Sequence, residues 1–176
     1  MRSSLKEQIG FFLRCRIPIF FSLLMVLLFF MPIHSVQINY FRPAIGLICV
    51  YYWRLNRGSL FSWGSAFCIG FIIDVYSSSP FGVNILLLML VNGTTGWLAR
   101  YFQAASFNVR WLIFSLSALF YMLIKWLFLM SYFWDYLPLA EITMGYFSTV
   151  MFYPLIATIN AWVATRFLPP ENIDEQ

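Results

Sequence analysis

Residues 111–134, WLIFSLSALFYMLIKWLFLMSYFW, decide the fold class, because a single charged side chain, Lys125, interrupts an otherwise uncharged run. At about 1.5 Å per helical residue, this segment is long enough to cross a ~30 Å hydrocarbon layer. The whole chain agrees: 61% of its 176 residues are apolar and 10% are charged, whereas a soluble domain carries about 25% charged residues. The mean hydropathy is +0.77. This composition predicts an integral membrane protein and excludes a sizeable soluble domain or a disordered chain.

Cutting the chain at its charged residues predicts an all-α fold, a single bundle of about six membrane helices. The expected segments are 17–33, 43–53, 59–73, 75–99, 111–134 and 142–165. The second segment would be only about 16 Å long. We therefore expect it to recruit residues 36–42, to be broken at Pro43, or to lie in a thinned or protein-lined place. The predicted organisation is a basic N-terminus (1–16), a transmembrane domain (17–168) and an acidic tail (169–176).

Basic residues predict the orientation, because Lys and Arg are retained on the cytoplasmic side of a membrane. Arg42 falls on the outer side of this arrangement and Lys125 lies within the fifth helix. The other nine of the 11 basic residues share one side, which places both termini in the cytoplasm: Arg2, Lys6, Arg14, Arg16, Arg54, Arg57, Arg100, Arg110 and Arg166.

The first apolar segment has two interpretations. A basic stretch followed by an apolar run is typical of a signal peptide. Residues 31–35, MPIHS, lack a small-x-small cleavage site, so we expect a retained membrane helix.

A stripe of small residues marks one face of the third segment. Ser62, Ala66 and Gly70 recur at every fourth position, which places them on one helical face where a neighbouring backbone approaches closely. This face is a candidate docking surface for a partner helix. Ordinary packing within the bundle is the alternative.

Two charged residues lie within predicted spans. Charges in a span are costly and usually face a partner or water. Asp74 lies 17 residues after Arg57, and Lys125 lies 15 residues after Arg110, so both reach a similar depth, about 25 and 22 Å along their helices. Their similar depth and opposite charge predict an ion pair between Asp74 and Lys125 inside the membrane. The alternative is that Lys125 reaches the outer interface and Asp74 ends its helix.

The motifs of common catalytic and metal sites are absent from the sequence. It contains no HExxH, GxSxG or P-loop motif, and Cys15, Cys49 and Cys68 have no metal-ligand spacing. We therefore predict no enzyme activity, no metal and no cofactor. Basic residues scattered between apolar segments also predict no nucleic-acid partner.

Two stretches resemble the family of the rod shape-determining protein MreD. They are residues 42–54, RPAIGLICVYYWR, and residues 70–84, GFIIDVYSSSPFGVN. The resemblance implies that seven residues are characteristic positions of the family: Arg42, Pro43, Gly70, Asp74, Pro80, Gly82 and Asn84. These residues would belong to a tight outer turn and to the helices before it. Pro80 and Gly82 would set the backbone of that turn, and Asp74 would satisfy its amides or Lys125.

The resemblance implies a non-enzymatic, multi-pass component of the bacterial cytoplasmic (inner) membrane that belongs to the cell-elongation machinery. Its expected partners are MreC, and more widely MreB, RodA and a penicillin-binding transpeptidase, besides membrane lipid. The family is also similar in overall fold to substrate-binding subunits of energy-coupling-factor transporters. An alternative function is therefore the binding of a small, vitamin-type molecule for transport, and an intramembrane enzyme is a third class.

Overall fold

The computed structural model describes residues 5–30, 42–77, 79–133 and 139–168. These ranges form six helices and no strand, so the prediction of an all-α protein with six helices is confirmed. The helices are α1 (Leu5–Phe30), α2 (Ile45–Asn56), α3 (Trp63–Tyr76), α4 (Val83–Phe102), α5 (Phe107–Phe133) and α6 (Leu139–Phe167).

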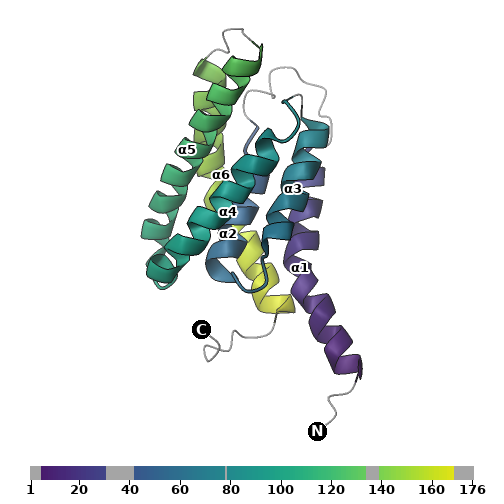
Figure 1. The fold of residues 1–176 in the computed structure, drawn as a ribbon. Helices are drawn as coiled ribbons and strands as arrows, with labels where there is room; N and C mark the ends of the chain where they lie inside the picture. Colours follow the sequence, from purple (N-terminus) through teal and green to yellow (C-terminus); the bar gives the residue numbers. More distant parts are fainter. Residues whose placement is uncertain (1–4, 31–41, 78, 134–138, 169–176) are drawn as a thin grey trace.

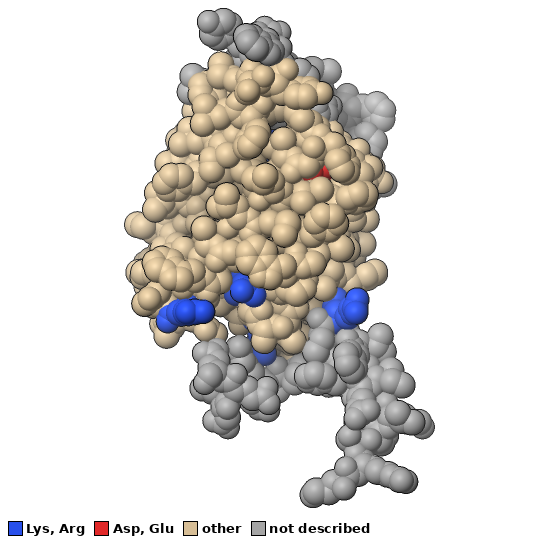
Figure 2. Space-filling model, viewed as in Figure 1, with Lys and Arg blue, Asp and Glu red and all other residues tan. Residues whose placement is uncertain are grey.

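The six helices run alternately in opposite directions and form one bundle (Figure 1). The beginning of α1 and the end of α6 therefore lie at the same end of the molecule. Figure 2 shows Lys and Arg side chains gathered toward that end. Among the described side chains, the basic residues of this end are Arg16, Arg54, Arg57, Arg100, Arg110 and Arg166.

Within the described ranges, three helices are long and apolar enough to cross a membrane: residues Val83–Phe102, Phe107–Tyr132 and Ile142–Phe167. Two further apolar helices, Arg16–Phe30 and Trp63–Tyr76, are shorter. The first helix begins at Leu5, well before the expected start at residue 17, because basic residues are compatible with a helix even where they do not suit hydrocarbon.

The short helix α2 is the centre of the bundle. Ten of its 12 residues are buried, and it packs against α1, α3, α4 and α6. A helix that is apolar on every side needs this kind of surrounding. Of the three arrangements expected from the sequence, the structure shows a helix that begins after Pro43 and is lined by protein. Residues 36–41 lie outside the described part.

The start of α2 is also fixed by a side chain from another helix. The backbone N–H of Ala44 donates to the hydroxyl of Thr149 in α6 at 2.9 Å. Thr149 is fully buried, so a donor that the helix itself leaves unpaired is satisfied inside the protein.

The boundary between the third and fourth helices differs from the expected one. Cutting the chain at Asp74 placed the next helix from residue 75. Instead, α3 continues to Tyr76, and α4 begins at Val83 after a turn. The prediction was wrong because Asp74 is 4% exposed and its charge is satisfied inside the protein, so it does not mark the end of a span.

The small-residue stripe of α3 packs largely inside the protein. A Cβ on Gly70 would lie 2.6 Å from the Cα of Ile85 in α4. Ala66 is fully buried, and only Ser62, at the N-cap of α3, is exposed. The stripe therefore serves close packing within the bundle, and Ala66 and Gly70 do not present a surface to a partner helix.

We predict that Gly70→Ala lowers the stability of the protein. The new methyl group meets the α4 backbone, which cannot rotate away, and overpacking of this kind costs about 1–3 kcal/mol. Gly145→Ala in α6 is the matched control, because its Cβ would meet only the Met122 Cε at 3.9 Å. Thermal unfolding in detergent should show a lower midpoint for Gly70→Ala alone. Equal midpoints for the two variants would contradict the close approach of α3 and α4.

Candidate functional site

The carboxylate of Asp74 joins the end of α3 to the start of α4. Its Oδ2 accepts hydrogen bonds from the backbone N–H groups of Gly82 at 3.0 Å and Ile85 at 3.1 Å. Its Oδ1 accepts from the backbone N–H of Asn84 at 3.1 Å and from the Asn84 side-chain amide at 2.8 Å. Four N–H donors therefore converge on one carboxylate.

This arrangement exists because α4 has no cap of its own. Its N-cap residue is Gly82, which has no side chain and adopts a left-handed backbone conformation with φ of 98°. The first amides of a helix lack partners within the helix, and the helix dipole favours a negative charge there. Asp74 supplies both the acceptors and the charge from a neighbouring helix. Gly70, one turn earlier in α3, allows the close approach that the cap requires.

Asn84 extends the cap into a buried network of side chains. It is fully buried, and its Nδ2 donates to Asp74 and to the Ser79 hydroxyl at 2.9 Å. Its Oδ1 accepts a hydrogen bond from the Tyr121 hydroxyl of α5 at 2.8 Å. The network therefore connects α3, α4 and α5 through Asp74, Asn84 and Tyr121.

Lys125 lies one helical turn beyond Tyr121 on α5, close enough to Asp74 for their charges to interact. The part of the chain that the structure describes contains no direct salt bridge between them. The reason is geometric: the Asp74 oxygens already accept four hydrogen bonds. A functional ion pair between the two stays a prediction, but the structure brings them into one region without contact.

Arg42 and Pro43 lie at the start of α2, near the same end of the bundle. The carbonyl of Pro43 accepts a hydrogen bond from the backbone N–H of Ile45 at 2.9 Å. Arg42 is exposed and lines a cavity together with Pro43, Tyr121 and Lys125. Pro80 lies in the turn between α3 and α4. Its carbonyl accepts a hydrogen bond from the backbone N–H of Val83 at 3.3 Å.

Sequence reasoning missed Tyr121 and Thr149. Tyr121 precedes Lys125 by four residues, and this spacing puts both side chains on one face of α5. That spacing could have indicated that Tyr121 and Lys125 belong to one polar face of the helix. Thr149 gave no comparable signal, because a threonine in a span most often bonds its own helix; here it does so as well, donating to the Gly145 carbonyl at 2.7 Å.

The geometry suits a rigid connection between helices. Every hydrogen bond to Asp74 comes from an N–H donor, so the carboxylate acts as a fixed acceptor. The described residues contain no group of three or more His, Cys, Asp or Glu side chains that could hold a metal ion.

We predict that Asp74→Asn destabilises the protein almost as strongly as Asp74→Ala. An asparagine has one acceptor oxygen, and its NH₂ group would face N–H donors. Hydrogen bonds to a charged group contribute about 1.5–3 kcal/mol, so the thermal midpoint in detergent should fall clearly in both variants. An Asp74→Asn protein with the wild-type midpoint would show that the negative charge is not needed for the cap.

We also predict a smaller loss for Tyr121→Phe. The change leaves the buried Asn84 Oδ1 without its donor, which costs about 1–3 kcal/mol. Tyr101→Phe is the control, since Tyr101 is an exposed tyrosine at the other end of the bundle. If unfolding midpoints show equal effects for the two variants, the Tyr121 hydroxyl does not contribute through Asn84.

A family model matches most of the chain. The family model of rod shape-determining protein MreD matches residues 9–163. An uncharacterized protein of Rickettsia prowazekii (strain Madrid E) is 30% identical over 113 residues, which cover 61% of this chain and 63% of the relative. The matched part of the chain thus spans somewhat less than two thirds of that relative's length.

No solved structure is significantly similar to the chain. The expected likeness to energy-coupling-factor subunits therefore gains no support from this comparison. The family match, in contrast, covers most of the chain, including the α3–α4 turn and its Asp74 cap. The chain belongs to the MreD family of rod shape-determining proteins.

Proposed function

We propose that this protein is a non-enzymatic component of the bacterial cell-elongation machinery in the inner membrane, where it binds the membrane helix of MreC. Through MreC it would help to couple MreB filaments to peptidoglycan synthesis by RodA and a penicillin-binding transpeptidase. The family match over residues 9–163 is the observation that carries the proposal. The helical bundle supports it, because a protein built mainly of helices acts chiefly through helix faces.

The outward face of α5 is the surface on which we expect MreC to bind. This helix lies at the edge of the bundle (Figure 1), and Leu112, Leu116 and Leu123 on it are exposed. The Ala66 and Gly70 face, which the sequence suggested, is already covered by the protein itself. A single partner helix can therefore reach α5 without displacing an existing contact.

Cysteine crosslinking in cells tests this proposal. Leu112→Cys, Leu116→Cys and Leu123→Cys should form adducts with cysteines in the MreC membrane helix, while Leu86→Cys and Leu90→Cys on the exposed face of α4 serve as controls. Each variant should also restore rod shape in cells that lack the native protein. Adducts confined to α4 would move the binding face. Rod shape restored without any adduct on either helix would contradict direct binding of MreC.

The expected orientation belongs to the same proposal. The end that carries Arg16, Arg54, Arg57, Arg100, Arg110 and Arg166 faces the cytoplasm, following the retention of basic residues there. A small-molecule transporter, the alternative function, would be recognised by a stoichiometric vitamin in the purified protein. Finding one would contradict the proposal.

A further inference from the structure

A cavity of about 540 Å³ opens among the helix ends opposite the arginine-rich end. It lies beside the Asp74–Asn84–Tyr121 network, and residues of α1, α2, α3, α5 and α6 line it. Its volume falls within the ~300–1,000 Å³ of typical small-molecule sites. Residues near the ends of five helices thus line a space large enough for a small molecule or for part of a larger one.

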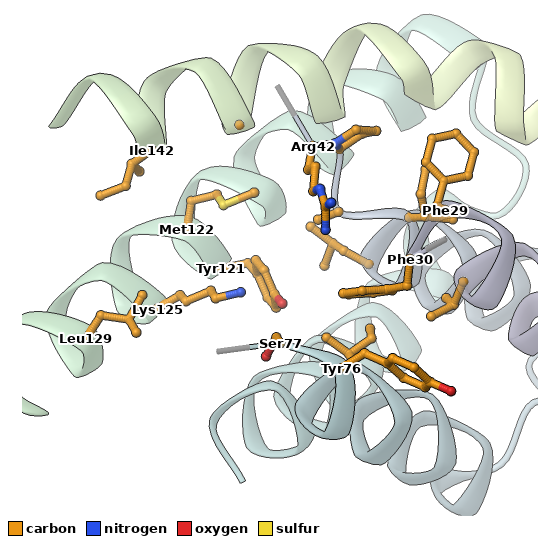
Figure 3. A pocket seen from close by; sticks show the side chains of 18 of the residues that line it. Phe29, Phe30, Arg42, Tyr76, Ser77, Tyr121, Met122, Lys125, Leu129 and Ile142 are labelled. Carbon is orange, nitrogen blue, oxygen red and sulfur yellow. The ribbon is translucent and has the colours of Figure 1, made fainter. Parts of the chain in front are cut away.

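Two cationic side chains point into this cavity. Figure 3 shows the Lys125 ammonium and the Arg42 guanidinium directed toward the space beside Tyr121 and Phe30. These are the two basic residues that depart from the cytoplasmic distribution of the other nine. A basic residue away from the cytoplasmic end runs against the usual bias, and both exceptions meet at one cavity.

The charges of the cavity are not balanced by the described side chains. Asp74 is the only carboxylate among the side chains that the structure describes, and its one negative charge, which interacts with Lys125, cannot balance both Lys125 and Arg42. An excess positive charge beside an apolar wall is costly without a further anion. The cavity is therefore suited to a ligand that brings a negative charge.

One side of the cavity is apolar, whereas Tyr76, Ser77 and Tyr121 bring polar groups to another part of its lining. The apolar side is formed by side chains from α1, α5 and α6: Val26, Phe29, Phe30, Met122, Leu129 and Ile142. These side chains offer no hydrogen-bond partners to a polar ligand but do suit a hydrocarbon chain.

We propose that this cavity binds an anionic amphiphile, with its anionic head between Arg42 and Lys125 and its hydrocarbon chain against the wall of α1, α5 and α6. Two sources supply this chemistry, an anionic phospholipid of the bilayer and a free long-chain acid. The proposal is independent of MreC binding, since the residues of α5 that line the cavity differ from Leu112, Leu116 and Leu123 on its outward face. Occupancy would supply the missing negative charge and connect the segment before α2 to α5 through one ligand.

Ligand-dependent stabilisation of the full chain in dodecyl maltoside tests the proposal. The probes are phosphatidylglycerol, oleate, zwitterionic phosphatidylcholine and inorganic phosphate. A ligand that binds the folded state raises the unfolding midpoint with concentration. We expect phosphatidylglycerol or oleate to raise it, and phosphatidylcholine and inorganic phosphate to leave it unchanged. The probe that acts identifies the source.

Matched variants locate the site. Arg42→Gln and Lys125→Gln should each weaken the concentration dependence at least tenfold, while the charge-conserving Arg42→Lys and Lys125→Arg retain most of it. Arg100→Gln, an exposed arginine in the last turn of α4, is the control and should bind as the wild type does. Size-exclusion profiles and helical circular dichroism report whether each variant is folded.

Four outcomes would overturn the proposal. They are no stabilisation by either anionic amphiphile, equal stabilisation by phosphatidylcholine, an equal effect of inorganic phosphate, and an equal loss in Arg100→Gln. The third would indicate a site for a small anion without a chain, and the last would indicate general attraction to the basic surface. None of them bears on crosslinking to MreC, so the two proposals fail separately.

Discussion

The capping of α4 by the Asp74 carboxylate is the interaction on which the rest of the structure depends. A helix that starts inside an apolar bundle leaves amide donors without water or an intrahelical partner. Asp74 satisfies three of these backbone donors and the Asn84 amide as well. The cap fixes the angle at which α4 leaves α3, and the Asn84–Tyr121 bond then extends this alignment to α5. One buried charge thus orients three helices.

The position of α2 shows a second constraint, the need of a short helix for protein around it. Twelve residues reach only about 18 Å, so α2 is too short to cross a full hydrocarbon layer. The surrounding helices take the place of lipid along almost its whole length. The Thr149 hydroxyl accepts a hydrogen bond from the backbone N–H of Ala44, just before the helix begins. The longer helices α4, α5 and α6 are long and apolar enough to cross a membrane in its place, and each carries exposed apolar side chains.

These two constraints separate a rigid centre from surfaces that remain available. Gly70 and Ala66 are used for close packing between helices, so a partner must bind elsewhere, and α5 at the edge offers the least occupied face. At the end opposite the arginines, the same rigid frame holds Arg42 and Lys125 at the cavity. The two proposals each use one of these surfaces, the outer face of α5 for MreC and the charged cavity for an anionic amphiphile.

The sequence alone determined the membrane class, the six helices and the segregation of basic residues, because each follows from composition and spacing along the chain. It also indicated Asp74 and Lys125 as residues that need an explanation, since a charge within a span is costly wherever the helices lie. Only the tertiary structure decided what satisfies them. The four donors on Asp74 come from α4, the Tyr121 bond comes from α5, and Arg42 meets Lys125 across a cavity between separate helices. Such contacts depend on how helices approach one another, and a linear pattern of charges does not specify which backbone amide will lie within 3 Å of a carboxylate.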